Sequence, residues 1–64
     1  MEVELDKEFT RGPMLLHVIF TATVYKNGDV EDHRATIEGH DITECFSLLE
    51  LQGMNEEFRK AYYG

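Results

Sequence analysis

The sequence predicts an α+β domain in which a three-stranded antiparallel meander carries helical structure on one face. Three observations lead to this fold class. Charged and apolar side chains alternate over residues 2–9, turn residues divide residues 2–38 into three strands, and the spacing of apolar residues becomes helical after Gly39. With 64 residues, the chain is long enough for a single domain, 1–64.

The first strand is predicted over residues 2–9, where charged and apolar side chains alternate. One face of this strand is apolar except for Lys7. The stretch Gly12-Pro13 predicts a turn, because proline is tolerated at the start of the following strand and not in its middle. The other face of the strand is acidic and consists of Glu2, Glu4, Asp6 and Glu8.

The second and third strands are predicted over residues 14–26 and 30–38. Asn27-Gly28 between them is typical of a two-residue type I′ hairpin turn. A two-residue loop pairs Phe20 with Ala35 and Thr23 with Asp32, whereas a three-residue loop shifts the register by one. The preferred register assigns to the core the even-numbered side chains Met14, Leu16, Val18, Phe20, Ala22 and Val24.

Helical structure is predicted over residues 42–52 and 55–62. Asp41 followed by Glu44 suggests a capping box at the helix start. Either Gly53 ends a first helix and the chain turns into a second one, or one long helix carries two apolar stripes; the spacing favours two helices. The stripe expected to pack on the sheet consists of Ile42, Cys45, Phe46 and Leu49.

The charge balance excludes some functions. The net charge is −7, from thirteen acidic and six basic side chains. This balance argues against direct nucleic-acid binding, which depends on Lys and Arg, and against attraction to anionic membranes. It fits either simple solubility or a protein partner with a basic surface. A lone cysteine and an N-terminus without the features of a secretory signal predict a cytoplasmic location.

No pattern in the sequence predicts catalysis, a cofactor or a metal. Ser47 lies within helical spacing and lacks the glycine-flanked turn of a hydrolase nucleophile. Cys45 falls on an apolar stripe, where a buried unreactive thiol is expected, and its pairing with His40 has no support from spacing. The histidines His17, His33 and His40 lack zinc-ligand spacing.

Two surfaces are candidates for binding. The first is an acidic edge, which either prevents strands of neighbouring molecules from pairing or offers carboxylates to a basic groove. Its residues are Glu2, Glu4, Asp6, Glu8, Glu31 and Asp32.

The second candidate is surplus apolar surface. A second helix that folds back covers part of it, or the residues form a homodimer or partner interface. These residues are Tyr25, Leu48, Leu51, Met54, Phe58 and Tyr62.

The layout of strand, hairpin and Gly39-His40-Asp41-Ile42-Thr43-Glu44 opening a C-terminal helix resembles small acidic proteins encoded by bacteriophages. Proteins of that type include anti-CRISPR and other host-takeover factors. The resemblance implies a non-enzymatic inhibitor that blocks a basic nucleic-acid-binding surface of a host protein. The alternative is a small structural or assembly protein that acts through a homodimer or complex interface.

Overall fold

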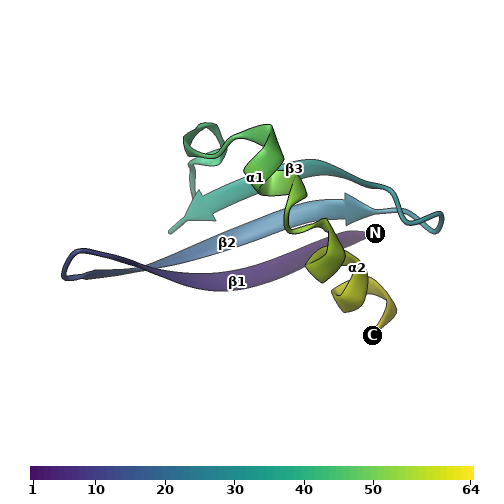
Figure 1. Cartoon of the computed structure of the whole chain (residues 1–64), viewed down its shortest axis with the longest axis horizontal. Coiled ribbons are helices and arrows are strands. Elements are labelled where there is room, and N and C mark those ends of the chain that lie inside the picture. Colours follow the sequence, from purple (N-terminus) through teal and green to yellow (C-terminus); the bar gives the residue numbers. More distant parts are fainter.

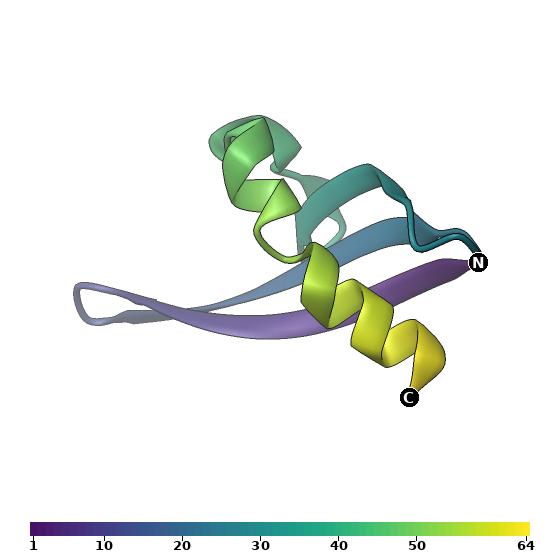
Figure 2. The same ribbon diagram turned by 45° about the vertical axis from the view of Figure 1, so that its right-hand side comes forward.

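A computed structural model describes residues 1–64 except for the side chain of Arg11. The described backbone forms one open antiparallel sheet with the strand order β1-β2-β3-β4, followed by a helical layer. The helical segments lie on one side of the sheet (Figures 1 and 2). This arrangement confirms the predicted α+β fold class. The elements are β1 (Glu2–Arg11), β2 (Met14–Val24), β3 (Val30–Ile37), β4 (His40–Asp41), the 3-10 turn η1 (Thr43–Cys45), α1 (Leu48–Gln52) and α2 (Asn55–Tyr63).

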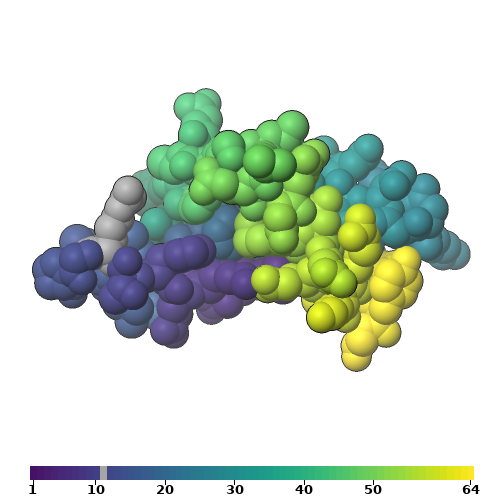
Figure 3. Space-filling model, viewed as in Figure 1, coloured from purple at the N-terminus to yellow at the C-terminus, as the bar shows by residue number. Residues whose placement is uncertain are grey.

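The β1–β2 hairpin is longer than predicted and has an uninterrupted register. Pairing runs from Glu2 opposite Thr23 to Arg11 opposite Met14, so β1 continues two residues beyond Phe9. Gly12 closes the hairpin with a φ of 61°. A positive φ followed by the fixed negative φ of proline suits a tight two-residue turn. The turn end of this hairpin projects beyond the helical layer (Figures 1 and 3).

The β2–β3 hairpin corrects the predicted turn. The pairing of Phe20 with Ala35 is confirmed, but Thr23 pairs with Glu31 and not with Asp32. The amide of Tyr25 donates to the carbonyl of Asp29 at 2.9 Å, which leaves a three-residue loop. Within this loop only Gly28 has a positive φ, 94°, so the type I′ turn does not form.

A β-bulge restores the register that the longer loop would have shifted. The shift lies between Thr21 and Thr23, and Asp32 on the opposing strand has a φ of 56°. Aspartate tolerates this left-handed conformation better than most residues do. The bulge therefore lets a three-residue loop coexist with the core pairing of Phe20 and Ala35.

The strand β4 was not predicted. Ile37 pairs with His40, and the two residues between them, Glu38 and Gly39, have φ values of 49° and 83°. Two successive positive φ values are those of a type I′ hairpin turn. The sequence signal was weak because glutamate, unlike asparagine or glycine, is rarely found in this conformation.

The helical region consists of two helices, as the spacing of apolar residues favoured, but the first helix begins later than predicted. Asp41 and Glu44 do not form the expected capping box; instead the Ser47 hydroxyl accepts from the Glu50 amide at 3.1 Å and Glu50 Oε1 accepts from the Ser47 amide at 2.9 Å. The helix thus begins at Leu48, six residues later than predicted and after η1. Gly53 ends α1, and α2 follows after Met54.

The core lies between the helical layer and the inner face of the sheet. Leu51 of α1 and Phe58 of α2 are buried against it. From the predicted stripe, Ile42 and Phe46 pack against the core, whereas Cys45 and Leu49 are exposed, because the 3-10 turn changes the helical phase. Met14 is 61% exposed because it lies at the projecting end of the hairpin. The buried sheet residues are Val3, Val18, Phe20, Ala22, Val24 and Ala35.

Contacts distant in sequence fasten the C-terminal helix and the N-terminus to the sheet. Arg59 Nε of α2 donates to the Gly28 carbonyl at 2.7 Å, and the Tyr63 hydroxyl donates to the Lys26 carbonyl at 3.1 Å. Both acceptors lie in the β2–β3 loop. Met1 exchanges two backbone hydrogen bonds with Val24, at 2.8 and 3.0 Å. These bonds hold the N-terminal end of β1 in the sheet.

We expect Glu38→Asn to stabilise the fold. A non-glycine residue in the left-handed region costs about 1–2 kcal/mol, and asparagine tolerates it better. The substitution should raise the free energy of unfolding by up to about 1 kcal/mol in urea titrations. Glu38→Gln, which removes the charge and keeps the backbone strain, is the control and should have little effect. Equal stabilisation by both variants would assign the effect to charge.

Candidate protein-binding surface

The outer face of the sheet is uncovered and carries the predicted acidic residues in one row. None of the described helical segments packs on this face. In the β1–β2 register, Glu4 lies opposite Thr21, Asp6 opposite Ile19 and Glu8 opposite His17. Directly opposed residues share a face, so the acidic row runs beside the odd-numbered residues of β2. The row consists of four exposed residues, Glu2, Glu4, Asp6 and Glu8.

Glu31 joins the same face, and Asp32 is displaced from the register. Glu31 lies opposite Thr23, which in turn lies opposite Glu2. Carboxylates therefore lie on both sides of β2, with Glu2 on β1 and Glu31 on β3. Asp32 occupies the bulge and has no pairing partner within the described β2–β3 register. It is exposed near β4, where it lines a shallow hollow with Arg34 and Asp41.

Among the described side chains, few positive charges lie beside the acidic row. His17 lies 3.7 Å from Asp6 and 3.8 Å from Glu8, beyond hydrogen-bonding distance. Lys7 belongs to the opposite face, where its Nζ contacts Glu57 of α2 at 2.5 Å. Arg34 Nη1 is 3.6 Å from Asp41. Exposed ion pairs of this kind contribute little stability, so the carboxylates remain available to a partner.

The predicted apolar surface is mostly used by the core. Leu51 is 5% exposed and Phe58 is 1% exposed, so neither can contact a partner directly. Met54 and Tyr62 are half-buried against the core. The second helix folds back over the sheet, and these four residues pack between the helical layer and the sheet. This is the first of the two alternatives that the sequence left open, and it removes these residues from a partner interface. Tyr25 and Leu48 remain exposed.

A different apolar surface escaped the sequence analysis. Leu49 is 80% exposed beside Leu48 on α1, and Phe9 is exposed on the projecting hairpin. Between hairpin and helix lies a groove of about 430 Å³, whose apolar lining includes Phe9, Leu16 and Phe46. The signal for it was the hairpin length, which exceeds what two short helices can cover.

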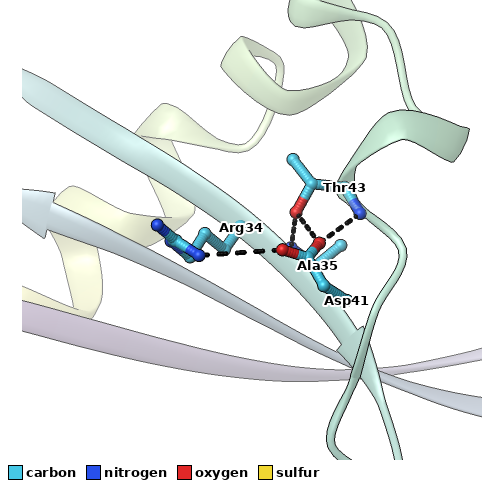
Figure 4. Close-up of polar contacts among 4 residues, drawn as sticks. All are labelled: Arg34, Ala35, Asp41 and Thr43. Atoms are coloured by element: carbon cyan, nitrogen blue, oxygen red, sulfur yellow. Dashed lines mark hydrogen bonds and ion pairs between the residues drawn. The ribbon is translucent and has the colours of Figure 1, made fainter.

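The Gly-x-Asp-Ile-Thr segment has a structural role. The Asp41 carboxylate accepts from the Thr43 amide at 2.8 Å and from its hydroxyl at 2.6 Å, and Thr43 Oγ1 accepts from the Ala35 amide at 3.0 Å (Figure 4). These bonds fix the corner between β3, β4 and η1. Hydrogen bonds from the Thr43 side chain and backbone lower the pKa of Asp41, and the Arg34 guanidinium lowers it further.

His17 and His33 lie on opposite faces of the sheet. His33 Nε2 is hydrogen-bonded to Asn55 Oδ1 at 2.6 Å and its ring packs edge-on against Phe58, under the helical layer. His17 lies on the outer face. Within the described part of the chain, no group of three or more His, Cys, Asp or Glu side chains could hold a metal ion.

No helix among the described residues has the length and apolar character required to cross a membrane. No protein-family model, curated protein or solved structure matches this chain.

We expect Asp41 to contribute to stability in a pH-dependent manner. Because its folded-state pKa is lowered, its contribution is present above the usual pKa of 3.8 and is lost as the pH falls through the folded-state value. The free energy of unfolding of Asp41→Asn should therefore lie furthest below that of the wild type near neutral pH. The difference should shrink below pH 3.8, as measured by urea titrations over a pH series.

Glu44→Gln is the control for this experiment, because it removes one negative charge from the same region. Its difference from the wild type should depend less on pH. A pH-independent difference for Asp41→Asn would show that the charged hydrogen bonds to Thr43 do not stabilise the fold.

Proposed function

We propose that this chain is a non-enzymatic protein-binding module whose acidic sheet face binds a basic surface of a partner protein. The observation that carries the proposal is the row of four exposed carboxylates, Glu2, Glu4, Asp6 and Glu8, on an uncovered face of the sheet. The net charge of −7 favours the same kind of partner.

The shape of the acidic row supports a nucleic-acid-binding groove as the target. Alternate residues of a strand are about 6.6–6.8 Å apart, so four of them place a line of charge along roughly 20 Å. A groove that holds nucleic acid presents Lys and Arg along the path of the phosphate backbone. A line of carboxylates occupies such a groove and keeps nucleic acid out. The resemblance to small acidic bacteriophage proteins points to the same kind of target, and with it we propose a stoichiometric inhibitor of the anti-CRISPR type, encoded by a bacteriophage and active in the host cytoplasm.

The charged row also fits the protection of a sheet edge against aggregation. Protection needs charge of either sign, whereas binding to a basic groove requires negative charge at these positions. Substitutions that preserve the fold and remove the charges separate the two roles.

We expect neutralisation of the acidic row to weaken capture of the partner strongly. The test variant combines Glu2→Gln, Glu4→Gln, Asp6→Asn and Glu8→Gln. Exposed ion pairs contribute about 0.2–1 kcal/mol each, so losing four should weaken binding by between roughly fourfold and several hundredfold. The measurement is affinity capture from bacterial host lysate at low and physiological salt, with retained proteins identified by mass spectrometry.

The matched control removes four charges from other exposed positions and should retain the partner. It combines Asp29→Asn, Glu38→Gln, Glu44→Gln and Glu56→Gln. A nucleic-acid-binding protein that both the wild type and the control retain, and that the test variant loses, supports the proposal. Competition between the chain and nucleic acid for that protein then tests the inhibitory step. Equal retention by all three baits would contradict the role of the row.

The exposed pair Leu48 and Leu49 favours a second candidate, assembly through a homodimer or complex interface. Adjacent exposed leucines beside an apolar groove are the kind of surface that association buries. The same capture experiment separates this candidate from the first. Retention of untagged copies of the chain, insensitive to salt, supports self-association.

A further inference from the structure

No strand of the described sheet pairs with the outer edge of β1. The strand order ends at β1, so only one of its two edges is paired within the described sheet. Met1 and Val24 exchange both of their backbone hydrogen bonds. In an antiparallel ladder, hydrogen-bonded and non-hydrogen-bonded pairs alternate along the strand. The odd-numbered residues of β1 therefore bond to β2, and the even-numbered residues direct their N–H and C=O groups toward the open edge.

The residues with outward backbone groups are the same residues that carry the acidic side chains. Glu2, Glu4, Asp6 and Glu8 are all even-numbered, and their side chains lie on the uncovered face. A strand added to this edge pairs residue by residue with them. Residues directly opposite them share their face and lie within reach of their carboxylates. Lysine or arginine at alternate positions of the added strand would therefore match both the hydrogen bonds and the charges.

The remaining positions of an added strand face the helical side of the sheet. There they would lie next to Val3, which is buried, and next to Leu5 and Lys7, which are half-buried. Phe9 is exposed on the same side of the hairpin. Small apolar or β-branched residues suit these positions, because such side chains pack well on the surface of a sheet. The edge thus favours a segment in which basic and apolar residues alternate.

A second copy of the chain does not fit this edge. Two β1 strands that pair antiparallel through their outward groups must place even-numbered residues opposite even-numbered residues. A pairing centred on Asp6 puts Glu4 opposite Glu8 in both halves of the interface. Like charges directly opposite each other destabilise a strand pair. The acidic row therefore selects against self-pairing and for a basic occupant.

We propose that the open edge of β1 binds an extended segment of the basic partner as an additional antiparallel strand, with lysine or arginine at alternate positions. The proposal rests on the proposed function and specifies how the partner is held. Backbone hydrogen bonds contribute to affinity in strand addition, and alternate side chains give specificity. The antiparallel direction continues the pattern of the existing sheet and is the more stable pairing per residue.

The test uses the peptide Lys-Val-Lys-Val-Lys-Val-Lys and the intact chain in calorimetric titrations at low salt. In the proposed arrangement the lysine amides point toward β1 and the valine amides point away. N-methylation of the internal lysine amides should weaken binding roughly tenfold or more, because several hydrogen bonds are lost. N-methylation of the valine amides is the matched control and should leave the affinity nearly unchanged. Lys-Lys-Val-Val-Val-Lys-Lys, with the same composition, should bind as weakly as the peptide with methylated lysines.

The outcomes separate this inference from the proposed function. If all of these peptides bind equally and the row variant binds none of them, the acidic face is a binding surface but strand addition is wrong. Loss of binding on valine methylation alone would overturn the antiparallel arrangement. If the wild type and the row variant bind the alternating peptide equally, the acidic row does not select the segment and this inference is wrong. Failure of the proposed function is measured separately, by retention of the host partner on the row variant.

Discussion

The continuous register between β1 and β2 determines most of the properties of this protein. Because side chains alternate between the faces of a strand, this register places Val3 and Leu5 beneath the helices and Glu4 and Asp6 on the open face. A slip of one residue would bury the carboxylates and expose the core. Two features hold the register: the tight turn at Gly12 and the backbone bonds between Met1 and Val24.

The core that this register builds is small, and contacts outside it supplement its stability. Phe58 is nearly inaccessible to solvent, and truncating a buried phenylalanine to alanine costs about 3–5 kcal/mol. That is a large part of the roughly 5–15 kcal/mol by which domains are stable. The bonds from Arg59 and Tyr63 to the β2–β3 loop tie α2 to the sheet. They allow a helix of nine residues to remain docked on a sheet that it only partly covers.

Strong local patterns made the strands and the acidic row predictable. Alternation over β1 required no knowledge of neighbouring strands. The pairing of Phe20 with Ala35 was predicted from a two-residue loop, and it holds because a bulge compensates for the longer loop. The loop was mispredicted because Asn27-Gly28 also suits a three-residue loop once a bulge at Asp32 absorbs the shift. This compensation involves both the loop and the bulge in β3. The sequence of the loop alone, or of β3 alone, therefore does not reveal it.

The start of the helix and the exposed leucines were harder to predict for a related reason. Asp41 has the chemistry of a helix cap, but the hydroxyl and amide of Thr43 engage its carboxylate first, and the helix begins only at Ser47. That delay shifts the helical phase, which leaves Leu49 exposed and Leu51 buried. The choice of helix start therefore decides which apolar residues are exposed. That choice depends on local hydrogen bonds between side chains and backbone, which the spacing of apolar residues does not reveal.

One set of residues in β1 supplies both the charges and the free backbone groups of the proposed binding edge. Amide hydrogen exchange along β1, resolved by NMR, tests it most directly. We predict slow exchange at Val3, Leu5 and Lys7 and fast exchange at Glu4, Asp6 and Glu8 in the isolated protein, with the latter three slowed when a basic partner binds. Protection of Glu4, Asp6 and Glu8 before any partner is added, or no change on binding, would contradict the account.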